Sequence, residues 1–77
     1  MPTDARQTPI ATLWQLAWNE DRVTCVVYRG REGLRLALET ATATILTEPF
    51  DLQPRMLARS AALRSSLIRH GWSDLPR

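Results

Sequence analysis

RVTCVVYRGREGLRLALE, residues 22–39, is the stretch that decides the fold of this 77-residue chain. Its two halves alternate apolar and other residues, which predicts a β-hairpin with one apolar face. That face consists of Val23, Cys25, Val27, Leu34, Leu36 and Leu38. Gly30 and Gly33 bracket the turn, where a positive φ is inexpensive only for glycine. Because an isolated hairpin is at best marginally stable in water, we expect another element to cover the apolar face.

The covering element is a helix that the sequence predicts after Asp51. Asp51 is suited to the N-cap, and Pro54 falls in the first turn, where its missing N–H costs nothing. Gly71 and Trp72 are placed as the C′ and C″ residues of a Schellman motif. One narrow arc of this helix is apolar and consists of Leu52, Met56, Leu63 and Leu67.

Residues 10–18 are compatible with two structures. The spacing of their apolar residues, with Pro9 at the N1 position, is typical of a helix. The alternation of Trp14, Leu16 and Trp18 indicates a strand instead, since large aromatic side chains suit a pleated surface. We favour the strand.

A further strand is predicted at residues 43–48, ATILTE, and Pro49 is expected to end it because proline donates no ladder hydrogen bond. The expected fold class is therefore α+β, a three- to four-stranded antiparallel β-meander with one C-terminal α-helix packed on one face. The predicted core joins the two layers and consists of Trp14, Leu16, Trp18, Val23, Cys25, Val27, Leu34, Leu36, Leu38, Leu52, Met56, Leu63 and Leu67.

The length of the chain allows one domain, which we place at residues 10–77 after a disordered N-terminal tail at residues 1–9. A hydrophobic content of 44% and a charged content of 23% argue against general disorder. Cys25 is the only cysteine, which excludes an internal disulfide and a cysteine-based zinc site. We expect a cytoplasmic protein, since the chain has neither a secretory signal pattern nor a long apolar run.

Four short segments are distinctive. They are LWQL at residues 13–16, CVV at residues 25–27, GLRL at residues 33–36 and GW at residues 71–72. In these segments the chain resembles a loose group of short uncharacterised bacterial proteins from GC-rich genomes. The resemblance covers most of residues 13–72 and implies a β-meander followed by a C-terminal helix. It brings no catalytic residues to this chain.

An arginine face on the predicted helix is the first candidate site. It is formed by Arg55, Arg59 and Arg69, and residues 51–77 contain five arginines against two acidic residues, a net charge of +3. Clustered guanidinium groups bind phosphates and acidic partners, so this face could bind nucleic acid. The competing interpretation is an ordinary solvated helix surface.

Apolar residues outside the core form the second candidate site. A helix on one side of a sheet leaves the other side in contact with water, and apolar side chains there favour pairing with a second copy. The candidate interface residues, on that face and beside the apolar arc of the helix, are Leu13, Val26, Tyr28, Leu57, Ala61 and Ile68.

The sequence predicts that the protein is not an enzyme and has no catalytic residue, cofactor or metal site. His70 is the only histidine, and beside a helix end it is expected to be a capping group. The leading hypothesis is a small interaction module that forms a homodimer or binds another protein. The alternative is nucleic-acid binding by the arginine face. A third hypothesis is a ligand-binding or catalytic domain with Trp14, Trp18 and Tyr28 as pocket walls.

Overall fold

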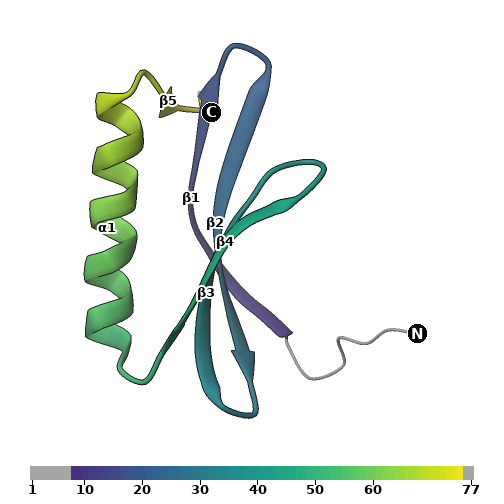
Figure 1. The fold of residues 1–77 in the computed structure, drawn as a ribbon, viewed down its shortest axis with the longest axis vertical. Helices are drawn as coiled ribbons and strands as arrows, with labels where there is room; N and C mark the ends of the chain where they lie inside the picture. Colours follow the sequence, from purple (N-terminus) through teal and green to yellow (C-terminus); the bar gives the residue numbers. More distant parts are fainter. Residues whose placement is uncertain (1–7, 76–77) are drawn as a thin grey trace.

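The computed structural model describes residues 8–75 as an antiparallel sheet with one helix on one of its faces (Figure 1). In chain order the elements are β1 (Thr8–Trp18), β2 (Asp21–Gly30), β3 (Gly33–Glu39), β4 (Thr44–Phe50), α1 (Gln53–Arg69) and β5 (Ser73–Asp74). The strand order across the sheet is β4-β3-β2-β1-β5. The predicted α+β class is confirmed, but the sheet has five strands rather than three or four.

The central hairpin of β2 and β3 has the register that its alternation predicts. Cys25 lies opposite Leu38, and Val27 lies opposite Leu36. These side chains join residues of β1 and α1 in one buried cluster, which consists of Leu16, Val23, Cys25, Val27, Leu36, Leu38 and Met56. The apolar face of the hairpin is therefore covered by α1, as expected from the sequence.

The segment that was ambiguous in sequence is the strand β1, which pairs with β2 along its whole length. Two β-bulges interrupt this pairing, because Ile10 and Leu13 have no partner on β2. Each bulge adds one residue and so changes which side of the strand the neighbouring side chains face. β1 includes Thr8 and Pro9, which were expected to belong to the disordered tail, and the rest of that tail lies outside the described residues.

Both edges of the sheet differ from the expectation. β4 continues through Pro49 to Phe50, because a proline is tolerated on an edge strand when its missing N–H is on the solvent side. β5 was not predicted at all. It pairs through Ser73 and Asp74 with the end of β1. Two residues are too few to produce a periodic signal in the sequence.

The two ends of α1 agree with the sequence to different degrees. Leu52 is the N-cap and no side chain caps the helix there, so the predicted Asp51 cap is wrong. The C-terminal end is confirmed as a Schellman motif. Gly71 has a φ of 110°, and the Trp72 N–H donates to the Leu67 carbonyl at 3.1 Å.

Two predicted core residues lie largely outside the core. Leu52 is 53% exposed and Trp18 is 49% exposed. Leu52 precedes the first turn of α1, whereas Trp18 is the last residue of β1 and lies beside the chain that follows the helix. Trp18 packs edge-on against Trp72 there, with ring centroids 5.8 Å apart.

Candidate functional site

A part-buried hydrogen bond joins the helix to the sheet. Nε1 of Trp14 donates to Oγ of Ser60 at 2.8 Å, and Sγ of Cys25 lies 3.7 Å from the same oxygen. Burial raises the pKa of the Cys25 thiol, and the hydrogen bond with Ser60 offsets this only in part. A buried, protonated thiol is a poor nucleophile. The contacts of Ser60 with Trp14 and Cys25 join α1 to β1 and β2, and in this way they position the helix over the sheet.

An apolar hollow lies between β1 and the start of α1. Its volume is about 120 Å³, and its lining includes Ile10, Leu13, Met56 and Leu57. Leu13 was expected on the opposite face of the sheet, but it packs against the core on the helix side because it forms a bulge. The fold thus brings Leu13 and Leu57, two of the predicted interface residues, into one hollow.

The helix extends this apolar surface along one flank. Leu57, Ala61 and Ile68 lie on the same side of α1, and all three are exposed. Arg64 lies among them and is held by Asp74 of β5, with its Nη2 at 2.6 and 2.7 Å from the two carboxylate oxygens. This flank is therefore the one on the β1–β5 side of the sheet. We call the apolar set on that side the flank surface: Ile10, Leu13, Leu57, Ala61 and Ile68.

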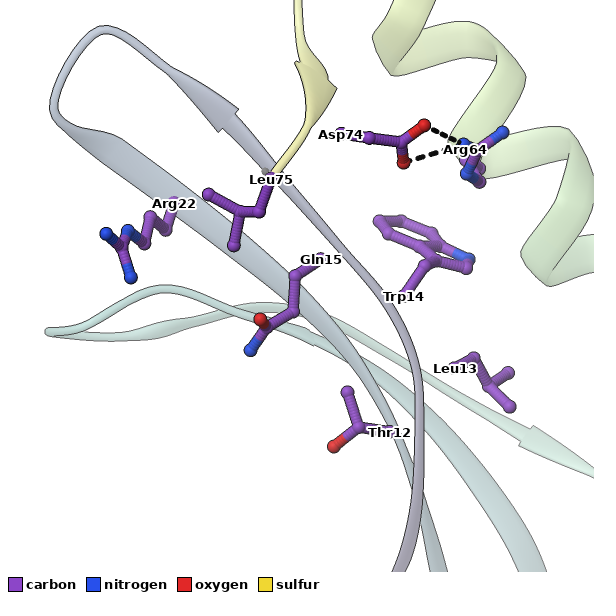
Figure 2. A pocket seen from close by; sticks show the side chains of 8 residues that line it. All are labelled: Thr12, Leu13, Trp14, Gln15, Arg22, Arg64, Asp74 and Leu75. Atoms are coloured by element: carbon purple, nitrogen blue, oxygen red, sulfur yellow. Dashed lines mark hydrogen bonds and ion pairs between the residues drawn. The ribbon is translucent and has the colours of Figure 1, made fainter. Parts of the chain in front are cut away.

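A wider, open hollow of about 880 Å³ follows the edge of β1 beyond the end of β5 (Figure 2). Figure 2 shows Thr12 and Gln15 on one side of β1, and Leu13 and Trp14 on the other side, toward α1. The hollow therefore surrounds the edge of the strand itself. The sequence signal that could have indicated this site is the complete lack of charged residues in β1, TPIATLWQLAW.

The face of the sheet away from α1 is not the apolar surface that the sequence predicted. Val26 is 8% exposed and Ala37 is 1% exposed, and the two residues lie opposite each other on β2 and β3. The sheet is strongly twisted (Figure 1). Tyr28 is half-buried, and its hydroxyl donates to Oε2 of Glu39 at 2.6 Å. This face therefore contributes little free apolar area.

The arginine face is divided by the tertiary structure. Arg59 forms a bidentate ion pair with Glu48 of β4, with Nε–Oε1 and Nη2–Oε2 distances of 2.9 Å. Arg55 and Arg69 are exposed near opposite ends of α1, about 21 Å apart along the axis at ~1.5 Å per residue. The three predicted arginines are thus spread along the helix, and one of them already has a partner. Arg64, which was not predicted to belong to this face, lies on the flank toward β1 and β5.

The pair of Glu48 and Arg59 makes a small, pH-dependent contribution to stability. The hydrogen bond from Arg59 lowers the pKa of Glu48. The stabilisation is therefore present above the ordinary glutamate pKa of about 4.3 and is lost as the pH falls through the lower, folded-state value. We expect urea unfolding at pH 7 to show that Glu48→Gln is slightly less stable than the wild type. The loss is small because both side chains are partly exposed to solvent. The difference should vanish at about pH 2; a difference that is unchanged in acid would exclude this ion pair as its source.

His70 is placed as the sequence predicted for a capping group. Its Nδ1 lies 2.7 Å from the carbonyl oxygen of Ser66, one turn earlier in the helix. Within the described part of the chain, no three histidine, cysteine, aspartate or glutamate side chains are grouped so that they could hold a metal ion.

No protein-family model matches the chain, and neither the curated proteins nor the solved structures provide a match. Over residues 8–75, no helix combines the length and the apolar character needed to cross a membrane.

Proposed function

We propose that this protein is a small non-catalytic interaction module that associates with a second copy of itself through the flank surface and the adjoining edge of β1. The observation that carries the proposal is the edge of β1. Among the described residues, β5 pairs with this edge only at Leu16 and Ala17, and β1 has no charged side chain. An uncharged, uncovered strand edge beside exposed apolar side chains favours association in water.

The opposite edge of the sheet is protected in the ways that edge strands commonly are. β4 carries Pro49, and it carries the charged Glu48, which Arg59 binds. Proline and charge both disfavour the addition of another strand. The difference between the two edges supports association at β1 rather than at β4.

Exposed apolar side chains next to the open edge provide the hydrophobic part of the contact. Ile10 is 49% exposed, Leu57 is 43% exposed and Ile68 is 39% exposed. Burial of apolar surface stabilises a complex by roughly 25 cal/mol per Å² before the costs of association. In a two-fold dimer every such contact occurs twice, so a modest surface is enough for a measurable affinity.

The test is the mass of the protein in solution, measured by analytical ultracentrifugation over a range of concentrations. We expect a monomer–dimer equilibrium with a dimer at high micromolar concentration. Leu57→Glu should raise the dissociation constant by about tenfold or more, since ~1.4 kcal/mol is sufficient for that change.

Ile45→Glu is the matched control. Ile45 is 58% exposed and lies on β4, at the edge that we expect to stay free. This variant should associate like the wild type. A wild-type protein that stays monomeric throughout the concentration range would contradict the proposal, and so would equal effects of the two substitutions.

A further inference from the structure

The apolar hollow between β1 and the start of α1 has a buried floor and an exposed rim. Val27 and Met56 belong both to the buried core and to the lining of the hollow. Ile10 and Leu57 also line it, and both are exposed. The hollow is therefore a concave site with an apolar lining next to solvent, which is the usual form of a small-molecule site.

The two bulges of β1 explain why the strand side of the hollow is apolar. Ile10 and Leu13 are the bulged residues, and both line the hollow. Ala11 lies between them, opposite Val27, and lines it as well. In a regular strand only every second residue faces one side of the sheet. The bulges thus bring three of four consecutive apolar or polar positions of β1 to one site, and all three are apolar.

Arg29 is the one charged residue that lines the hollow among the described residues. Val23, Cys25 and Val27 form the row of β2 side chains beneath α1, and Arg29 is the next residue of that row because strand side chains alternate. β2 ends at the same end of the molecule at which α1 begins (Figure 1). An arginine that continues an otherwise apolar row places a permanent positive charge next to the apolar hollow.

The charge of Arg29 is not neutralised by the described part of the chain. Each of the two ion pairs within residues 8–75 joins α1 to a strand, and neither includes Arg29. The residues opposite Arg29 on the neighbouring strands are Thr8 and Leu34, which carry no charge. Gln53, the first residue of α1, is the other polar residue in the lining and is also uncharged. Arg29 is therefore available to an anionic group in the hollow.

We propose that the hollow binds a small monocarboxylic acid with an apolar body, whose carboxylate pairs with Arg29 and whose apolar group lies against Met56 and Leu57. This binding goes beyond the proposed self-association and does not depend on it. A guanidinium group matches a carboxylate in charge and in geometry, because it offers two parallel N–H donors. The side-chain amide of Gln53 supplies a further donor for the same carboxylate.

The volume of the hollow limits the size of the apolar group. At about 120 Å³ the hollow is comparable with a cavity of ~150 Å³ that takes up benzene. One ring or a branched chain of roughly four to six carbons therefore fills it, whereas a drug-sized ligand needs roughly 300–1,000 Å³. A long acyl chain would leave most of its length in water. A doubly charged phosphate is a poorer match, because a single positive charge lines the hollow.

An NMR titration with three probes tests this proposal. Phenylacetate has both the ring and the carboxylate, phenylacetamide has the ring without the charge, and acetate has the charge without the ring. We expect phenylacetate to shift the methyl resonances of Leu13, Met56 and Leu57. It should bind at least about tenfold more tightly than either other probe, since a charged hydrogen bond and a buried ring each contribute that much.

Arg29→Gln separates the ion pair from apolar packing. This variant should bind phenylacetate about tenfold more weakly than the wild type and should bind phenylacetamide equally well. Arg22→Gln is the matched control, because Arg22 is also exposed on β2 but belongs to the row that faces away from α1. It should bind phenylacetate like the wild type. Both substitutions are at exposed positions, so we expect the fold to be retained.

The titration is made at tens of micromolar protein, below the range in which we expect the dimer, so that a second copy does not compete for Leu13 and Leu57. Equal affinities for phenylacetate and either other probe would overturn the inference, and so would unchanged binding by Arg29→Gln or shifts confined to residues outside the hollow. A protein that dimerises but does not bind phenylacetate would contradict this inference alone. A protein that binds phenylacetate as expected but stays monomeric at every concentration would contradict the proposed self-association alone.

Discussion

Leu36→Ala is expected to lower the free energy of unfolding by about 2–5 kcal/mol. Leu36 is fully buried, and it lies at the centre of the sheet opposite Val27 on β2 and Glu48 on β4. Its removal takes away apolar contacts and leaves a cavity that strands fixed on both sides can close only in part. A domain of this length has a total stability of about 4–12 kcal/mol, so the variant should be partly unfolded near physiological temperature.

The matched control for this substitution is Ile45→Ala. Ile45 is 58% exposed on the edge strand β4, so its truncation should change the stability by less than about 0.5 kcal/mol. Urea unfolding followed by circular dichroism measures both variants. Equal effects of the two substitutions would mean that the apolar cluster beneath α1 is not the core of this domain.

Ser60→Ala is expected to lower the free energy of unfolding by about 1–3 kcal/mol, although it removes a single oxygen. Ser60 is 3% exposed, and its Oγ accepts the hydrogen bond from Nε1 of Trp14. Without this oxygen, the indole N–H of Trp14 is shielded from water by the helix and has no hydrogen-bond acceptor. The lost hydration of this N–H group is the main cost. Intrinsic helix propensity acts in the opposite direction, since alanine is the better helix former by a few tenths of a kcal/mol.

A double-mutant cycle with Trp14→Phe separates the hydrogen bond from packing. Phe has no N–H, so Ser60→Ala in the Trp14→Phe background should cost much less than in the wild type. Near-ultraviolet circular dichroism reports on the tryptophan environment in the same samples. A cost that is identical in both backgrounds would show that Ser60 acts through packing alone.

Much of this fold was predictable because its signals are local. The alternation of the central hairpin describes one apolar face over two strands that are adjacent in sequence, and the register of Cys25 with Leu38 confirms it. The C-terminal end of the helix was predictable for the same reason. Gly71 is the residue type that accepts the left-handed conformation, and its φ of 110° confirms that placement.

The candidate site was predicted only in part because its position depends on long-range pairing. Leu13 was assigned to the wrong face, since a bulge becomes apparent only when the partner strand is known. Arg59 was assigned to a free arginine face, but Glu48, eleven positions earlier in the chain, binds it. The apolar flank residues of α1 share one side of the helix, as helical periodicity predicts, and the structure shows them exposed.

The sequence by itself determined the class of the fold, the central hairpin and the amphipathic helix, because apolar periodicity and turn chemistry act between residues that are close in the chain. Only the tertiary structure decided that, within residues 8–75, β5 forms two pairs with β1 and the rest of the outer edge of β1 has no partner strand, and that bulges turn Leu13 toward the helix. The physical reason is that backbone hydrogen bonding between strands is the same for nearly every residue type. The register of strand pairing, and with it the positions of the bulges, therefore depends on how the sheet and the helix pack together.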